Sequence, residues 1–463
     1  MLLHSDRLLP PDPATKAIAR GLYAAVADRP IVSPHGHTDP RWWGENSAFS
    51  NPADLFIVPD HYVVRMLVSQ GVRYEELGIG EGAERDPRTI WRCFAANYHL
   101  FQGTPSRLWL DHALSTVFGL AGRLSPANAD AHYDAIAEQL ASPHYRPREL
   151  YDRFGIEVIA TTDSALDDLR WHAMARESGW KGRVVPTYRP DAVIDPDSED
   201  FAANLDRLGD LTGCDTGSWL GYLEAHRARR AFFRRMGATA TDHGHPTPRT
   251  ADLAETAAAA LFARVRSGKI DSGDAELFRA QMLTEMARMS VEDGLVMQLH
   301  AGSFRSHNAA VYSRYGRDRG FDIPVPVSFT VALKPLLDAV GMDTRLRLIL
   351  FTLDETTYSR ELAPLAGAYP SLRLGPPWWF HDSFEGIRRF RELATETAGF
   401  RNTVGFNDDT RALCSIPARH DVSRRVDSAF LAELIVTHRL DEAEAYEIAP
   451  LLSDGLAREG YRL

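Results

Sequence analysis

Short apolar runs alternate with longer amphipathic stretches along the whole chain. Eight of these runs are bounded by turn residues and have the composition of β-strands. They span residues 30–37, 156–163, 183–189, 238–243, 295–302, 346–354, 372–378 and 402–409. Between them, apolar residues recur about every three to four positions, which is typical of helices packed on a core. Eight strands alternating with helices predict an α/β fold, a (β/α)8 barrel of the TIM type.

The longest interval between these strands separates the first from the second. Residues 62–150 read as helices and loops, with helical apolar spacing in segments such as IWRCFAANYHLF and NADAHYDAIAEQLA. We therefore expect a helical insertion that covers the mouth of the barrel. The barrel itself then comprises residues 1–61 and 151–463.

Composition and charge narrow the classes of partner. The 463 residues are 44% hydrophobic and 25% charged, which is the balance of an ordinary soluble globular protein. The formal net charge of −11 argues against nucleic acid or an anionic membrane as a partner. No apolar run approaches the roughly 18 residues of a membrane helix, and charge and proline near the start argue against a signal peptide. We expect a cytoplasmic protein whose three separated cysteines are reduced.

Polar side chains stand at the ends of five of the eight strands, where barrel enzymes place their catalytic groups. In the segment PHGH, His35 and His37 are one residue apart, and alternate residues of a strand share a face. The other strand ends carry Arg189, Asp242 with His243, His300, and Asp408 with Asp409, followed by Arg411. Neutral imidazoles together with a carboxylate are what Zn²⁺ or a similar divalent ion requires. The pattern therefore predicts one divalent metal at the barrel mouth.

Each piece of this pattern also has an interpretation without a metal. His35 and His37 alone could be hydrogen-bonded polar residues, and His300 could be a satisfied core histidine. If the last strand stays extended, Asp408 and Asp409 face opposite ways, so only one can bind the metal. Asp409 would then share its face with Arg411, whose alternative role is a structural ion pair with either aspartate.

Motifs along nearly the whole chain resemble the uronate isomerase (glucuronate isomerase) family of the amidohydrolase superfamily. In order they are PHGH, DHYVVRML, TTDS, VPTYRPD, ATDHG, MQLHAGSFRSHN, PPWWFHDS and DTR. Members of this family are metal-dependent (β/α)8 barrels. The resemblance implies conversion of D-glucuronate to D-fructuronate and of D-galacturonate to D-tagaturonate. Val63, Val64 and Gly36 depart from the family's usual residues and indicate a divergent branch.

The resemblance also implies roles for individual residues. It assigns the metal, expected to be one Zn²⁺, to His35, His37 and Asp409, with His300 beside it in the catalytic group. It assigns the anionic sugar substrate to Arg189, Arg411, Arg305, Trp378, Trp379 and His243. Tyr62 resembles the family's active-site tyrosine. We also expect a homo-oligomer.

Isomerising an aldose to a ketose moves a proton from C2 to C1 through an enediol, which requires a base and a stabiliser of the developing oxyanion. Tyr62 and Asp409 are the candidates for proton transfer, and the sequence does not decide which acts first. The alternative function is a one-metal hydrolase of the same superfamily, acting on a lactone, ester or amide of a sugar acid. A barrel that binds sugar acids without turnover would retain the histidines, Asp409 and the arginines for no chemical purpose.

Overall fold

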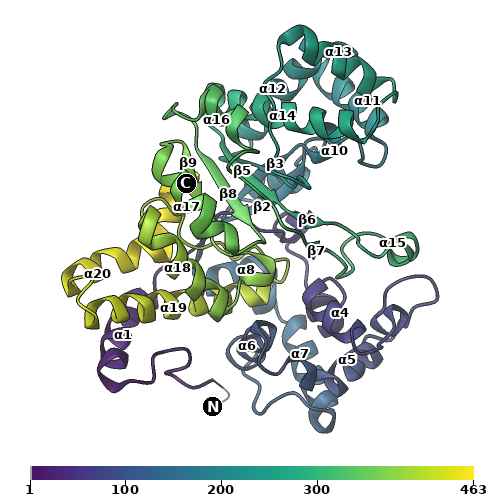
Figure 1. Ribbon diagram of the computed structural model, residues 1–463. Coiled ribbons are helices and arrows are strands. Elements are labelled where there is room, and N and C mark those ends of the chain that lie inside the picture. Colours follow the sequence, from purple (N-terminus) through teal and green to yellow (C-terminus); the bar gives the residue numbers. More distant parts are fainter. Residues whose placement is uncertain (1–2) are drawn as a thin grey trace.

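A curved parallel sheet forms the centre of the computed structural model, which describes residues 3–463 (Figure 1). Its seven strands lie in the order β1-β2-β3-β4-β5-β8-β9, and every pairing is parallel. Their bounds are β1 Ile31–Ser33, β2 Ile156–Ser164, β3 Arg183–Arg189, β4 Ala240–His243, β5 Val296–Ala301, β8 Leu348–Thr352 and β9 Leu372–Leu374. The (β/α)8 barrel architecture expected from the sequence is confirmed.

The eighth expected strand, residues 402–409, is reduced to one bridge. Thr403 pairs with Leu374 of β9, and the residues after it leave the ladder. Gly405 has a φ of +75°, which a regular strand does not allow. A Cβ at Gly405 would lie 3.2 Å from the carbonyl oxygen of Leu452, so the C-terminal segment packs directly against this turn. Asp409 also has a positive φ, of 40°, so the chain is not extended there.

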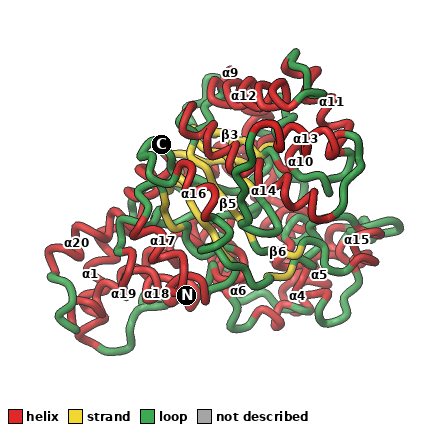
Figure 2. Tube along the Cα trace, turned by 45° about the horizontal axis from the view of Figure 1, so that its top comes forward, coloured by secondary structure: helices red, strands yellow, loops and turns green. Residues whose placement is uncertain are grey.

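Helices cover the outside of the sheet, and Figure 2 shows them surrounding the strands. Those that follow β2 to β5 are α9 Arg170–Glu177, α10 Asp191–Ile194, α11 Phe201–Thr212, α12 Trp219–Arg235, α13 Glu255–Arg266, α14 Ser272–Asp293, α15 Ala309–Tyr315 and α16 Lys334–Val340. Those after β8 are α17 Ala363–Ala368, α18 Phe384–Ala398, α19 Ile416–Val436, α20 Glu442–Pro450 and α21 Leu456–Tyr461, and α1 Pro13–Val26 packs against α19 and α20.

The segment between β1 and β2 is helical. It contains α2 Pro40–Glu45, α3 Pro52–Phe56, α4 His61–Val68, α5 Pro87–Ala96, α6 Pro105–His112, α7 Ala129–Ala141 and α8 Pro147–Arg153. The sequence sets several starts, because Asp86 and Thr104 cap α5 and α6 and a proline follows each cap. These helices share a hydrophobic core with Ile31 of β1 and Ile156 of β2. Whether they cover the barrel mouth stays a prediction.

Two further features frame the site. After β5 the chain forms a short antiparallel hairpin, β6 Ser303–Phe304 with β7 Ile323–Pro324, which carries α15 on an arm (Figure 1). Tyr461, the last residue of α21, is fully buried and donates a hydrogen bond to Gln298 of β5 at 2.9 Å. Over residues 3–463, no helix is both long and apolar enough to span a bilayer. Cys93, Cys214 and Cys414 are all free thiols.

Candidate active site

Two histidines and a carboxylate meet where β1 ends. Nε2 of His35 lies 3.5 Å from Oδ1 of Asp409, and Nε2 of His37 lies 3.2 Å from the same oxygen. Ligands of a tetrahedral zinc lie about 2.0–2.2 Å from the ion and therefore about 3.3–3.6 Å from one another. The spacing of these three donors thus fits the ligand set of a small divalent cation, as the sequence predicts.

The positive φ of Asp409 directs its carboxylate to the two histidines. The backbone N–H of His37 also donates to the carbonyl oxygen of Thr410 at 3.0 Å, which ties the end of β1 to the same turn. Asp408 points elsewhere, since its Oδ2 lies 3.0 Å from Nε2 of His420 on α19. Only Asp409 therefore faces His35 and His37, although the turn at Asp409 and not the extended strand of the sequence argument separates the two carboxylates.

A second group of possible donors overlaps the first and comprises His35, Asp242 and His300. The His300 ring stacks on His35 with centroids 4.6 Å apart, and its Nδ1 lies 2.6 Å from Oδ1 of Asp242. Nε2 of His300 and Nδ1 of His35 are buried and have no hydrogen-bond partner among the described residues. A buried polar atom without a partner is costly unless it serves a ligand or a reaction.

Burial sets the protonation of this centre. It lowers the pKa of His35 to about 3, so the imidazole is neutral at physiological pH and can donate its lone pair to a cation. Burial raises the pKa of Asp409, but His35 and His37 outweigh it and hold that pKa well below its usual value. A neutral imidazole beside an ionised carboxylate is the state in which such groups bind metal.

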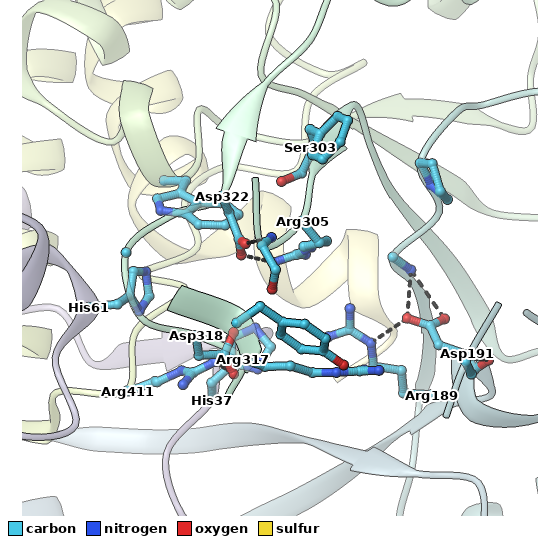
Figure 3. Close-up of a pocket in the computed structure, with 18 of the residues that line it drawn as sticks. His37, His61, Arg189, Asp191, Ser303, Arg305, Arg317, Asp318, Asp322 and Arg411 are labelled. Carbon is cyan, nitrogen blue, oxygen red and sulfur yellow. Dashed lines mark hydrogen bonds and ion pairs between the residues drawn. The ribbon is translucent and has the colours of Figure 1, made fainter. Parts of the chain in front are cut away.

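Arg189 at the end of β3 is held by two carboxylates. Its Nε lies 2.8 Å from Asp191 and its Nη1 lies 3.4 Å from Asp242. The backbone N–H of Gly244 donates to both oxygens of Asp191, at 3.1 and 3.2 Å. A Cβ at position 244 would lie 2.2 Å from Nη2 of Arg189, so only glycine leaves room for the guanidinium. Figure 3 shows Arg189 and Asp191 together on one side of the cavity.

The position expected for Arg411 needs a correction. The extended chain assumed for residues 409–411 would have placed its side chain beside Asp409. Instead the positive φ of Asp409 turns the chain, and Nη2 of Arg411 lies 2.9 Å from Oδ2 of Asp318. Asp318 comes from the long connection between β6 and β7, and Figure 3 shows it beside Arg411 and His37. Arg411 still lines the cavity.

The two tryptophans and Arg305 lie together at the cavity, as the resemblance implies. Trp378 contacts His300 edge-on with centroids 4.6 Å apart, and the guanidinium of Arg305 lies 5.0 Å from the ring centroid of Trp379. Arg305 also forms a 3.0 Å ion pair with Asp322. Cation–π contact and the ion pair both hold the arginine at the rim.

The expectation that His243 contacts the substrate also needs a correction. His243 is fully buried, its Nδ1 lies 2.9 Å from the carbonyl oxygen of Gln298, and it is not among the residues that line the cavity. His245, two residues later, lines the cavity instead. The strand ends at His243, so the side chain that reaches the opening belongs to the following loop.

Tyr62 reaches the cavity from the first turn of α4. Asp60 caps this helix, and its Oδ1 accepts the backbone N–H of Tyr62 at 2.9 Å. The Tyr62 hydroxyl donates to Oδ2 of Asp382 at 2.9 Å. Burial, followed by the charge of Asp382, raises the pKa of Tyr62 well above its usual value, so the phenol is neutral.

Many of these groups line one open cavity of about 1040 Å³, although His35 and His300 are not among its lining residues (Figure 3). Its walls include His37, Asp409, Tyr62, Arg189, Arg411, Arg305, Trp378 and Trp379. Cations, carboxylates and aromatic faces therefore line one space, which suits a small hydroxylated anion.

Several residues of the site escaped the sequence interpretation. Asp242 was visible as a polar residue at a strand end but received no role, although it contacts both His300 and Arg189. Asp382 stands in the motif PPWWFHDS but received no role, and Asp318 and Arg419 carried no local signal, because they lie in a loop and within a helix.

Comparison with known proteins identifies close relatives. A family model described as glucuronate isomerase matches residues 13–452. A relative from Rhizobium meliloti strain 1021, named uronate isomerase, is 64% identical over 100% of this chain and 99% of its own length. The crystal structure of glucuronate isomerase from Caulobacter crescentus has 56% identity and a TM-score of 0.98, and covers 99% of this chain and 97% of its own. That of uronate isomerase from Thermotoga maritima has 27% identity and a TM-score of 0.93, with both chains fully covered.

Proposed function

The chain belongs to the glucuronate isomerase family, and from this premise we propose how its own residues carry out the reaction. Its activity is the aldose–ketose isomerisation of hexuronates. The single observation that supports the proposed site is the convergence of His35, His37 and Asp409, with both Nε2 atoms within 3.5 Å of one carboxylate oxygen.

His35, His37 and Asp409 would hold one divalent ion, which we propose to be Zn²⁺, with His300 beside it. Bound there, the ion would act as a Lewis acid that polarises the oxygens on C1 and C2 of the substrate. Asp242 orients His300 through the hydrogen bond to its Nδ1, which leaves Nε2 free to face the centre.

The arginines bind and orient the substrate anion. Arg411 pairs with one partly exposed carboxylate, that of Asp318, whereas Arg189 already contacts two carboxylates. Arg411 is therefore the guanidinium more available to a uronate carboxylate, which it matches with two parallel N–H donors. Arg189 and Arg305 assist at the sides of the cavity, and Trp378 and Trp379 cover the sugar.

Tyr62 and Asp409 are the two groups placed to move the proton between C2 and C1. Tyr62 lines the cavity with a neutral hydroxyl, and Asp409 lines it with an ionised carboxylate. Proton transfer by such groups contributes about 10²–10⁴-fold to a rate. The order in which the two act stays open.

Removing two ligands tests the proposed centre. Metal analysis of the double variant His35→Ala/His37→Ala should show most of the divalent metal lost, and isomerisation lost with it. His99 and His144 are exposed, so His99→Ala/His144→Ala is the matched control and should keep both. Undiminished metal in the His35→Ala/His37→Ala protein would place the ion elsewhere.

The proposal extends to the setting in which the enzyme works. It acts in the cytoplasm on a small sugar acid, without nucleic acid or membrane as a partner, and it assembles as a homo-oligomer. The net charge of −11 supports the exclusion of nucleic acid and anionic membrane as partners. Sedimentation of the purified protein tests the homo-oligomer, and a mass equal to the 51.6 kDa monomer at all concentrations would contradict it.

A further inference from the structure

A buried ion pair, Asp382 with Arg419, contacts the Tyr62 hydroxyl, and the proposed reaction gives it no role. Asp382 lies between the turn Trp379–His381 and α18, and it is 5% exposed. Its Oδ2 accepts two hydrogen bonds, one from the Tyr62 hydroxyl at 2.9 Å and one from Nη1 of Arg419 at 2.5 Å. One carboxylate oxygen therefore joins the tyrosine to a buried cation.

Hydrogen bonds and an aromatic contact hold the Arg419 side chain in place. It comes from the first turns of α19, and its Nη1 also donates to the carbonyl oxygen of Asp408 at 3.2 Å. Its Nε donates to Oγ of Ser415 at 3.2 Å, and its guanidinium lies 3.6 Å from the ring centroid of Trp109. A cation held in this way is a permanent counter-charge for Asp382.

A gain in stability does not explain why the carboxylate of Asp382 is buried. The side chains of Asp382 and Arg419 are 4% and 3% exposed, and a buried ion pair is often no more stabilising than apolar residues of the same volume. Oδ1 of Asp382 is also buried without a hydrogen-bond partner in the described chain, which costs further stability. A group that is costly to bury, next to a residue that lines the active site, points to function.

The direction of the hydrogen bond matters for the chemistry. An ionised carboxylate can only accept, so the Tyr62 proton points at Asp382. The lone pairs of the Tyr62 oxygen take no part in that bond, and the side chain that carries them lines the cavity. A phenol arranged in this way can accept a proton from a substrate, provided that its own proton has somewhere to go.

We propose that Asp382 is the positioning residue of Tyr62 and receives its phenol proton during isomerisation. This inference rests on the proposed role of Tyr62. The substrate C2–H bond breaks, its proton forms an O–H bond with the Tyr62 oxygen, and the electron pair becomes the C=C bond of an enediolate. The original phenol O–H bond breaks, and that proton bonds to Oδ2 of Asp382, which Arg419 continues to contact. The hydroxyl proton on O2 then passes to O1. Tyr62 delivers the proton taken from C2 to C1 while the C2=O bond forms, and the phenol proton returns from Asp382 to the Tyr62 oxygen.

The test is a comparison of Asp382→Asn with the wild-type enzyme in steady-state kinetics on hexuronates. An amide oxygen can still accept the Tyr62 hydrogen bond but cannot take up the proton. We expect kcat to fall about a hundredfold, with KM within about threefold of wild type. In a Tyr62→Phe background the same substitution should change kcat by no more than about twofold, because the two residues act as a unit.

The chain offers a matched control for buried charge. Asp427 on α19 forms a comparable pair with Arg391, at 2.6 and 3.1 Å and with side chains 5% and 2% exposed, outside the cavity lining. Asp427→Asn should lose stability and keep kcat. If Asp382→Asn does not fold, Asp382→Glu and Asp382→Gln replace it, since both add one methylene and only the first keeps a carboxylate. The Glu variant should then turn over faster.

Two results would overturn the inference. In one, Asp382→Asn is as active as Asp427→Asn, or the Glu and Gln variants are equally active. In the other, Asp382→Asn lowers kcat as strongly in the Tyr62→Phe background as in the wild type. Normal turnover by the Tyr62→Phe variant would instead contradict the proposed function, because it would show that Tyr62 has no part in the reaction.

Discussion

Arg411 is the residue whose substitution best separates substrate binding from folding and metal binding. Its guanidinium lines the cavity and contacts Asp318 rather than the metal-binding carboxylate. A lysine would keep the charge but lose the planar pair of donors that matches a carboxylate. We expect Arg411→Lys to lower kcat/KM for hexuronates at least about tenfold, a loss of about 1.4 kcal/mol, with metal content and thermal unfolding nearly unchanged.

The control for this substitution is Arg345→Lys. Arg345 forms an exposed ion pair with Asp343, and such pairs contribute about 0–1 kcal/mol. This variant should have wild-type kinetics. If Arg411→Lys isomerised hexuronates normally, Arg411 would have no part in binding the substrate.

At the scale of elements, the loop after β4 determines where Arg189 can lie. The Cβ of an alanine at position 244 would meet Nη2 of Arg189 at 2.2 Å and Oδ2 of Asp191 at 2.9 Å. Gly244→Ala should therefore displace the guanidinium and raise KM for hexuronates about tenfold, while the metal stays bound. Gly367→Ala in α17 is the control, since its nearest contact would be 3.8 Å away. Equal KM values for the two variants would show that the position of Arg189 does not matter.

The secondary-structure elements also show how much of the fold and the site the sequence could predict. Periodicity and turn residues located seven strands, and the rule that catalytic groups follow strands located His35, His37, Arg189, His300 and Asp409. The eighth strand was wrong, because Gly405 and Asp409 have a positive φ, and Gly405 packs against a C-terminal segment that a local pattern does not reveal. The pairs Tyr62–Asp382 and Arg411–Asp318 could not be found, since their partners are 320 residues apart in the first case and belong to an irregular loop in the second.

At the scale of the whole molecule, buried histidines make the stability depend on pH. Burial lowers the pKa of His226 to about 3 and those of His112 and His172 to about 4, against 6.5 for an exposed group. Below pH 6.5 the unfolded chain binds protons that the folded protein does not, so stability is present above 6.5 and is lost as the pH falls toward 4.

Each such histidine should cost on the order of 2 kcal/mol of unfolding free energy between pH 7 and pH 5. Urea unfolding followed by circular dichroism at both pH values measures the difference. We expect a clear fall in the transition midpoint at pH 5. A midpoint that is unchanged at pH 5 would show that these histidines are protonated in the folded state.

The most direct test of the whole account is an NMR time course of D-glucuronate in D₂O with the purified protein, before and after removal of divalent metal by a chelator. The account predicts ketose formation that stops with the chelator and returns when zinc is added back, because His35, His37 and Asp409 hold an ion that the reaction needs. Ketose formation that is unaffected by metal removal would contradict the proposed centre. A protein that left every hexuronate unchanged while it hydrolysed sugar-acid lactones would contradict the assignment as an isomerase.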